Sequence, residues 1–325
     1  MEIDHREQVL TLQTWLGTQI LGQDRLVNRL LIALIADGHL LVEGAPGLAK
    51  TKAIKTLAAS LEGEFHRIQF TPDLLPSDVT GTEIYHADDG TFRFQQGPIF
   101  HNLILADEIN RAPAKVQSAL LEAMAERQVS FGRETFALPQ LFLVMATQNP
   151  IEQEGTYSLP EAQLDRFLMH VNVKYPDAAT EREILQLVRR EALSGPGTKN
   201  ATPDNLLTQA AVFEARREVL TLHMAPVVEE YIVQLTMATR NPGLYDDELA
   251  AWCAYGASPR GTIALDVCAR ANAFLMGKDF VSPDDVLAVV HDVMRHRLIL
   301  SFEAEAAGVT TDDVIDALIQ RVAAG

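Results

Sequence analysis

The amino-acid sequence predicts an α/β fold built on a parallel sheet, followed by a region made only of helices. Apolar runs typical of strands alternate with helical periodicity up to about residue 175. After a stretch rich in turn residues, the periodicity is helical almost to the end. A length of 325 residues favours about two domains. We therefore expect a core at 1–185, a linker at 186–204 and a helical domain at 205–325.

Four apolar runs predict the strands of the core: Leu40–Glu43, His66–Phe70, Asn102–Ala106 and Leu141–Ala146. The last run is almost continuously apolar, which is typical of a strand buried on both faces of a parallel sheet. Apolar residues at helical spacing follow Lys50 and Pro113, so a helix is expected to begin near each of them. In the C-terminal region, Ser258-Pro259 and Ser282-Pro283 predict helix starts, with serine as the N-cap and proline in the first turn.

Two short segments interrupt the core and are predicted to form β-hairpins. Residues 82–94 place Asp89 and Gly90 between alternating runs, which is a strong hairpin signal. Residues 128–138 show a similar pattern that turns near Gly132. Either hairpin alone could be a surface decoration, but two within one core are harder to dismiss.

Composition and charge restrict the class of protein. The net charge of −17 and the isoelectric point of about 4.9 argue against a broad basic surface that wraps nucleic acid, although a local basic groove stays open. Cys253 and Cys268 lack metal-ligand spacing and indicate buried thiols of a reducing compartment. The longest apolar run, 30–42, is too short and too polar to span a bilayer, and no signal peptide precedes it. We expect a cytoplasmic protein.

A strand-to-helix loop nearly matches the phosphate-binding pattern G-x-x-x-x-G-K-[ST], with alanine in place of the second glycine. Its residues are Gly44, Ala45, Pro46, Gly47, Leu48, Ala49, Lys50 and Thr51. The backbone N–H groups and the helix N-terminus would face an anion. Lys50 could reach the β- and γ-phosphates of a nucleotide, and the Thr51 hydroxyl could hold Mg²⁺. The alternative is a glycine-rich turn with a chance lysine.

Polar residues follow the next two predicted strands. Asp107 and Glu108 lie at the carboxyl end of a buried strand, the edge at which ligands bind in open α/β sheets. Phosphoryl transfer to water needs a carboxylate near Mg²⁺ and a group that orients the water. We assign Asp107 to the metal, through its water shell, and Glu108 to the attacking water. Asn149 could bond the γ-phosphate or the attacking water; alternatively, it is a turn asparagine before Pro150.

Two arginines are further candidates. Arg166 carries a guanidinium suited to bidentate phosphate contact, although an isolated arginine is more often a surface ion-pair residue. Arg260 falls in the first turn of a predicted helix, where a positive charge is unfavourable unless an anion lies nearby. That anion could be a nucleotide phosphate or an acidic side chain of the α/β domain.

These motifs, in this order, resemble those of AAA+ ATPases and, more narrowly, of the MoxR family. The resemblance covers about residues 15 to 300 and rests on GAPGLAKT at 44–51, ADEINRAP at 106–113, ATQNP at 146–150, LPEAQLDRF at 159–167 and ASPRG at 257–261. Ala49 also looks like the MoxR form of the loop. The resemblance implies an AAA+ P-loop domain with hairpin inserts and an all-α lid, together with ATP and Mg²⁺ as cofactors.

The family pattern implies a role for each motif. Walker A would include Lys50 and Thr51, and Walker B would be Asp107 and Glu108. Asn149 would be sensor 1, Arg260 sensor 2 and Arg166 the arginine finger that completes a neighbouring subunit's site. The segment 20–23, with Gly22 and Gln23, looks like the one that lines the adenine pocket.

The resemblance also implies partners and a use for ATP. A finger that acts in trans requires a ring of copies of this chain, and we expect a hexamer. MoxR proteins resemble chaperones that remodel or mature client proteins or metal-cofactor complexes, often with a separate partner that has a von Willebrand factor A domain. A magnesium-chelatase-like motor subunit, a nucleic-acid translocase and a non-catalytic nucleotide-gated scaffold are the alternatives. Nucleic acid is the less favoured partner, because the predicted hairpins carry no basic patch.

Overall fold

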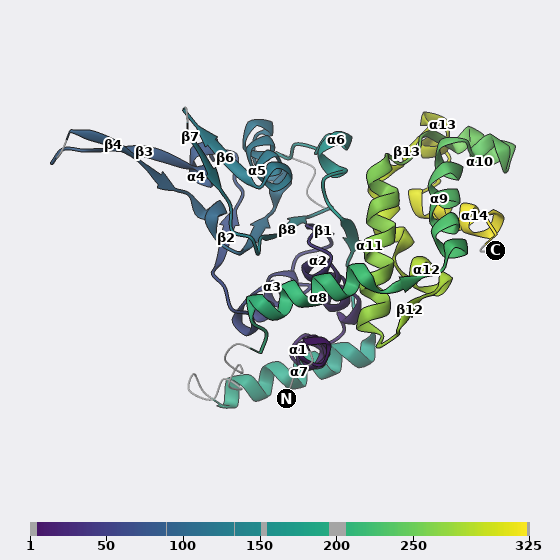
Figure 1. Ribbon diagram of the computed structural model, residues 1–325, viewed down its shortest axis with the longest axis horizontal. Helices are drawn as coiled ribbons and strands as arrows, with labels where there is room; N and C mark the ends of the chain where they lie inside the picture. The colour runs from purple at the N-terminus through teal and green to yellow at the C-terminus, as the bar shows by residue number, and fades with distance from the viewer. Residues whose placement is uncertain (1–4, 89, 133, 151–154, 195–205, 324–325) are drawn as a thin grey trace. The chain divides into compact units, whose positions relative to one another are not determined.

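The computed structural model in Figure 1 describes residues 5–88, 90–132, 134–150, 155–194 and 206–323. Contacts between Cα atoms divide the chain into two compact units. The first unit comprises Met1–Leu31, His39–Leu159 and Val171–Val212. The second comprises Ile32–Gly38, Pro160–His170 and Phe213–Gly325. The segment that carries Arg166 therefore groups with the C-terminal helices.

A five-stranded sheet with strand order β2-β5-β8-β1-β9 organises the first unit. Its strands are β1 (Leu40–Glu43), β2 (Phe65–Gln69), β5 (Leu103–Asp107), β8 (Leu143–Gln148) and β9 (Met169–Asn172). Strand β2 pairs with β5, β5 with β8 and β8 with β1, all in parallel. The predicted α/β fold with a parallel sheet is confirmed.

Strand β8 begins and ends two residues later than the sequence suggested. Pairing with β5 starts only where Leu103 lies opposite Leu143, and pairing with β1 continues until Glu43 lies opposite Gln148. Asn149 therefore follows the strand directly, at the same edge of the sheet as the end of β5.

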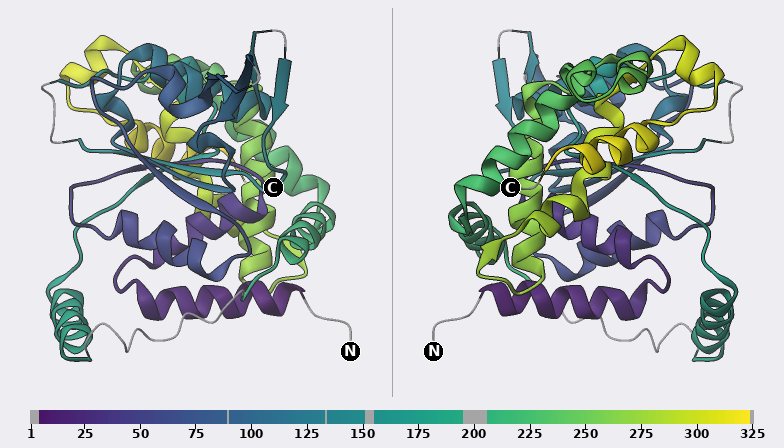
Figure 2. Two further views of the ribbon diagram at one scale, coloured as in Figure 1. Left: turned by 90° about the vertical axis from the view of Figure 1, so that its left-hand side faces the viewer. Right: turned by 90° about the vertical axis from the view of Figure 1, so that its right-hand side faces the viewer.

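Helices cover both faces of this sheet, with α5 on one face and α3 on the other (Figure 1). Figure 2 shows α1 alongside α3, as the outer helix on that side. Helix α3 buries the apolar stripe that the sequence predicted after Lys50. Helix α7 continues through residue 194, so the beginning of the predicted linker is helical, and 195–205 lies outside the described residues. The bounds are α1 His5–Gln19, α2 Asp24–Ile35, α3 Lys50–Ser60, α4 Pro76–Thr80, α5 Ala114–Glu126 and α7 Ala178–Ser194, with short 3₁₀ turns η1 Pro98–Phe100 and η2 Ile109–Arg111.

Both predicted hairpins are present in the first unit. One pairs β3 (Gly81–His86) with β4 (Thr91–Gln96), and the other pairs β6 (Gln128–Phe131) with β7 (Glu134–Ala137). The Phe94 ring of β4 stacks on the Phe136 ring of β7 with centroids 4.4 Å apart, so the two hairpins pack against one another. The predicted turn residue Asp89 lies outside the described residues.

The second unit is mainly helical, with Phe167 and Phe274 fully buried in its core. Ser258 and Ser282 cap helices as predicted. Two short strand pairs, β10 with β12 and β11 with β13, depart from the expectation of helices only; each strand is too short to produce a readable alternation. The bounds are α6 Glu161–Leu164, α8 Gln209–Thr221, β10 His223–Met224, α9 Pro226–Arg240, η3 Pro242–Leu244, α10 Asp247–Trp252, β11 Cys253–Tyr255, α11 Pro259–Leu275, β12 Phe280–Val281, α12 Pro283–Met294, η4 Arg295–Arg297, β13 Ile299–Leu300, α13 Phe302–Ala306 and α14 Thr311–Arg321.

Among the described residues, no helix is long and apolar enough to cross a membrane. Cys253 is partly buried and Cys268 is buried, and both are free thiols. Burial raises the pKa of the Cys253 thiol, so it is a weaker nucleophile than an exposed cysteine.

Candidate active site

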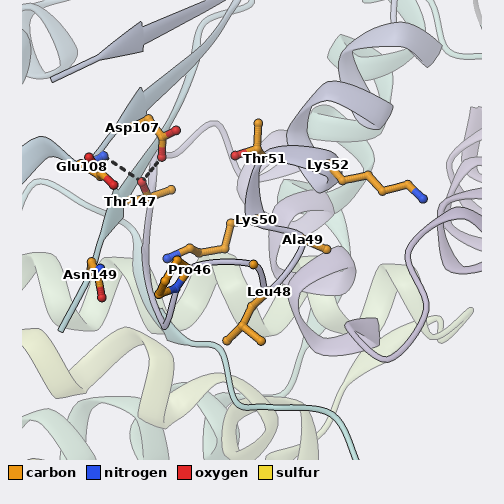
Figure 3. A pocket seen from close by; sticks show the side chains of 11 residues that line it. Pro46, Leu48, Ala49, Lys50, Thr51, Lys52, Asp107, Glu108, Thr147 and Asn149 are labelled. Carbon is orange, nitrogen blue, oxygen red and sulfur yellow. Dashed lines mark hydrogen bonds between the residues drawn. The ribbon is translucent and has the colours of Figure 1, made fainter. Parts of the chain in front are cut away.

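A cavity of about 310 Å³ opens at the carboxyl edge of the sheet in the first unit (Figure 3). Its lining comes from the loop after β1, the start of α3 and the ends of β5 and β8: residues 46–52, Asp107, Glu108, Thr147 and Asn149. The candidate groups for phosphate, metal and water thus share one cavity, although they come from three separate stretches of the sequence.

The backbone conformation of the loop between β1 and α3 shows why glycine is the expected residue at position 49, where this chain has alanine. Ala49 adopts a left-handed conformation with φ 56° and ψ 13° at the N-cap of α3. Glycine reaches this region without strain, whereas alanine takes it at a cost of about 1 kcal/mol. Gly47 also has a positive φ of 84°, and a Cβ at that position would meet no atom within 4 Å. The backbone at Gly47 is therefore open for close approach of a ligand.

Lys50 begins α3 and lies between the loop and β8. Its Nζ donates hydrogen bonds to the backbone oxygens of Gly44 and, at 3.3 Å, of Gln148. Burial lowers the pKa of Lys50, and the carboxylates of Asp107 and Glu108 act in the opposite direction. An ammonium on this loop, beside the N-terminus of an 11-residue helix, fits a phosphate chain.

Asp107 is bound on both of its carboxylate oxygens. The Thr147 hydroxyl donates to Oδ1 at 2.6 Å. The Arg67 guanidinium donates to Oδ2 from Nε at 3.0 Å and from Nη2 at 2.6 Å. Oδ2 of this candidate metal ligand is therefore paired with the Arg67 guanidinium in this structure. Thr51, the other candidate metal ligand, lines the same cavity, so the set of oxygens fits Mg²⁺.

Glu108 is held in an unusual conformation. Its backbone has φ 57° and ψ 51°, a left-handed region that non-glycine residues occupy at a cost and that recurs at functional sites. Its N–H donates to the Thr147 hydroxyl at 2.9 Å. Its Oε2 accepts hydrogen bonds from Gln69 Nε2 at 2.8 Å and from Arg111 Nη1 at 3.2 Å. Both donors bind Oε2, so the carboxylate can orient a water molecule through Oε1 while they stay in place.

The remaining candidates of the first unit are Asn149, Gly22 and Gln23. Asn149 is buried and lines the cavity. Gly22 and Gln23 lie in the first unit but outside the lining; Gln23 Nε2 donates to the Lys174 backbone oxygen at 3.4 Å. Their assignment to adenine stays a prediction.

Arg166 and Arg260 belong to the second unit. Arg260 has an acidic neighbour, Asp165, at 3.9 Å. The sequence offered an acidic side chain of the α/β domain as the competing explanation for a cation in the first turn of a helix; Asp165 falls inside the predicted core at 1–185 but groups with the second unit. Both arginines keep their assigned catalytic roles as predictions.

Sequence reasoning missed Thr147, Arg67 and Gln69. The sequence does show that Gln69 is a polar residue at the end of a predicted strand. In the sheet, Gln69 lies opposite Asp107 of β5. Reading that signal requires the strand order, which places β5 between β2 and β8.

This chain is similar to known proteins over most of its length. Residues 39–169 match the model of the ATPase family associated with various cellular activities (AAA), and residues 250–318 match the AAA lid domain. "Chaperone MoxR1" of Mycobacterium tuberculosis is 48% identical over 94% of this chain and 79% of its own length. The crystal structure of a Cytophaga hutchinsonii protein named as a candidate ATPase is 45% identical, with a TM-score of 0.89 over 98% of this chain and 95% of that one. A magnesium-chelatase 38 kDa subunit of Acidiphilium rubrum is more distant, at 26% identity over 94% of this chain and 97% of its own length. This chain belongs to the MoxR family of AAA+ ATPases.

Proposed function

We propose that this ATPase works as a ring-forming chaperone that remodels or matures client proteins or metal-cofactor complexes, with a separate partner that has a von Willebrand factor A domain. The similarity to a protein named as a chaperone supports the general class. The observation that carries the proposal is the single cavity that unites Lys50, Thr51, Asp107, Glu108 and Asn149.

Each of these residues has a task in ATP hydrolysis. Lys50 and the amides at the start of α3 bind and orient the phosphates. Thr51 and Asp107 would hold Mg²⁺, which neutralises charge on the phosphate oxygens. Glu108 orients the attacking water and takes up its proton, and Asn149 donates a hydrogen bond at the γ-phosphate or the water.

The proposed ring follows from the expected arginine finger. Such a finger contributes about 10³- to 10⁵-fold to turnover in well-studied nucleotide hydrolases. Arg166→Ala should therefore keep ATP binding and lose turnover, and mixing it with Glu108→Gln should restore part of the activity. Full turnover of a strictly monomeric preparation would contradict a finger supplied in trans.

The hairpins supply a surface for the proposed client. Ile84, Tyr85 and Phe92 on β3 and β4 are 41%, 55% and 65% exposed, which is high for large apolar side chains on paired strands. The β6–β7 hairpin, which packs against this one, follows α5 directly. Helix α5 begins a few residues after Glu108 and leads into the β6–β7 hairpin. A conformational change at Glu108 on ATP binding or hydrolysis can therefore reach the hairpins through α5.

Three alternatives remain. A magnesium-chelatase-like motor subunit would use the same cavity with other partners, and the lower identity to such subunits makes it second. A nucleic-acid translocase is less favoured, because Glu83 and Asp88 accompany Arg93 on the first hairpin and the chain carries a net charge of −17. A non-catalytic scaffold would not need a carboxylate placed like Glu108.

Affinity capture with Glu108→Gln in the presence of ATP tests the proposal. The change should slow hydrolysis and hold the client-bound state, while Lys50→Ala, which weakens phosphate binding, serves as the matched control. Recovery of a protein with a von Willebrand factor A domain only with Glu108→Gln would support the chaperone. Recovery of nucleic acid alone, or equal recovery with both variants, would overturn it. Cell fractionation tests the cytoplasmic location, which the two free thiols favour.

A further inference from the structure

The carboxylate of Asp165 joins three parts of the second unit. Its Oδ1 accepts a hydrogen bond from Arg297 Nε at 3.0 Å. Its Oδ2 accepts one from the Ser258 hydroxyl at 2.9 Å and lies 3.9 Å from Arg260 Nη1. We infer that Asp165 is a positioning residue that links Arg166 to Arg260, so that the two arginines respond to nucleotide together. This inference rests on the roles proposed above for these arginines.

The contact between Asp165 and Arg297 fixes the backbone on both sides of Arg166. The Arg297 side chain is only 2% exposed, and it also donates to the backbone oxygens of Phe167 at 2.7 Å and Leu168 at 3.2 Å. Burial lowers the pKa of Arg297, and Asp165 opposes that change by favouring the charged form. A buried guanidinium without its carboxylate is costly, so the pair holds residues 165–168 firmly in place.

The Ser258 contact fixes the start of the helix that carries Arg260. As the N-cap of α11, the Ser258 hydroxyl accepts a hydrogen bond from the backbone N–H of Arg260 at 3.2 Å, and it donates one to Asp165. The Arg260 side chain is 56% exposed and its contact with Asp165 is long. Such a pair is weak, and a phosphate could compete for the guanidinium.

Arg166 therefore lies between two anchored neighbours. Asp165 before it is held by Arg297 and Ser258, and Phe167 after it is fully buried. Withdrawal of Arg260 toward an anion changes the charge balance at the Asp165 carboxylate, one residue from Arg166. If Arg260 serves its own subunit's nucleotide and Arg166 the neighbour's, Asp165 couples the two sites.

Asp165→Asn tests the link, because asparagine keeps the size but removes the charge and one acceptor. Asp312→Asn is the matched control: Asp312 binds Arg295, also of η4, at 3.0 and 2.9 Å, and no hydrogen bond or ion pair found among the described residues joins it to Arg260 or Ser258. We expect Asp165→Asn to lower kcat by about 3- to 30-fold, the range for residues in a coupling network. Asp312→Asn should leave kcat within about twofold of the wild type.

Three further readouts separate positioning from a loss of folding. First, Asp165→Asn combined with Arg260→Ala should be no slower than the slower single variant. Second, Asp165→Asn mixed with Glu108→Gln should recover less activity than Arg166→Ala mixed with Glu108→Gln, because both arginines are misplaced in one subunit. Third, Ser258→Ala leaves the pair between Asp165 and Arg297 intact. It should lower the Hill coefficient for ATP while the thermal unfolding midpoint stays close to that of the wild type.

Multiplicative effects in the double variant, or equal recovery in the two mixtures, would overturn the inference. So would equal loss of kcat in Asp165→Asn and Asp312→Asn. These outcomes are distinct from a failure of the proposed function, in which Arg166→Ala itself would keep full turnover. If Asp165→Asn does not fold, Ser258→Ala decides: an unchanged Hill coefficient would contradict the link.

Discussion

The Thr147 hydroxyl donates a 2.6 Å hydrogen bond to Asp107 Oδ1 and accepts the backbone N–H of Glu108 at 2.9 Å. One buried side chain on β8 thus fixes two consecutive residues at the end of β5 (Figure 3). The left-handed backbone of Glu108 depends on such a contact, since that conformation is strained without support.

Removal of this hydroxyl should damage metal-dependent binding more than folding. Thr147→Val keeps the shape but leaves the N–H of Glu108 and one oxygen of Asp107 without their partner. We expect turnover, or the affinity for Mg²⁺ in the presence of ATP, to fall by about 10- to 100-fold, as for other residues that orient metal ligands. Thr147→Ser retains the hydroxyl and should behave almost as the wild type in the same Mg²⁺ titration. Equal curves for the valine and serine variants would contradict this role.

Arg67 should compete with the metal at Asp107. It pairs with Oδ2 through two nitrogens, but its side chain is 43% exposed, so the pair contributes at most about 1 kcal/mol. Arg67→Leu should therefore lower the Mg²⁺ concentration needed for half-maximal nucleotide binding, by up to about fivefold. Arg111→Leu removes the same charge from Glu108 instead and should change that concentration less. Fluorescent nucleotide binding at varied Mg²⁺ provides the measurement, and a rise for Arg67→Leu would refute competition.

The main features of the cavity could be predicted from local sequence. The loop at 44–51 and the acidic pair at the end of a strand can be recognised in the sequence, because each pattern lies within a few residues. The partners that hold Asp107 and Glu108 could not be predicted, since Arg67 and Thr147 come from strands on opposite sides of β5. Their meeting depends on strand order and register, which no short window contains.

The second unit shows the same limit. The helix start at Ser258 could be predicted from its N-cap and proline, and the structure confirms it. The Ser258 hydroxyl donates a hydrogen bond to the carboxylate of Asp165, which lies far away in the sequence. Arg297, from a third segment, donates a hydrogen bond to the same carboxylate. Long-range pairs of this kind leave no periodic signal.

Position 49 offers a test of backbone conformation. Ala49 has φ 56°, so Ala49→Gly removes the left-handed strain, while the added freedom of the unfolded chain offsets part of the gain. We expect the free energy of unfolding to change by less than about 1 kcal/mol and nucleotide affinity to stay within about threefold. Ala49→Val places a β-branched residue in this region and should weaken nucleotide binding by at least about tenfold. Equal affinity of the valine and glycine variants would show that the loop does not need this conformation.

Asp285 should contribute strongly to the stability of the second unit. Its side chain is 1% exposed and accepts hydrogen bonds from Lys278 at 2.8 and 2.9 Å, from Asn272 at 3.0 Å and from the N–H and hydroxyl of Ser282 at 2.9 and 2.7 Å. Burial alone would raise its pKa, but these donors outweigh it, and the pKa of Asp285 lies below the ordinary value. Asp285→Ala should therefore lower the free energy of unfolding near neutral pH by about 3 kcal/mol.

The pH dependence of that loss follows from the direction of the shift. A carboxylate with a lowered pKa stabilises the folded state fully above its unfolded pKa of about 3.9, and this contribution disappears as the pH falls through the folded pKa. The difference between the wild type and Asp285→Ala should stay constant from about pH 7 to pH 5 and narrow toward pH 3. Urea unfolding across this range measures the difference, with Glu303→Ala, which changes an exposed acidic residue of the same unit, as the control. A difference that stays constant down to pH 3 would mean that packing, and not the ionised carboxylate, supplies the stability.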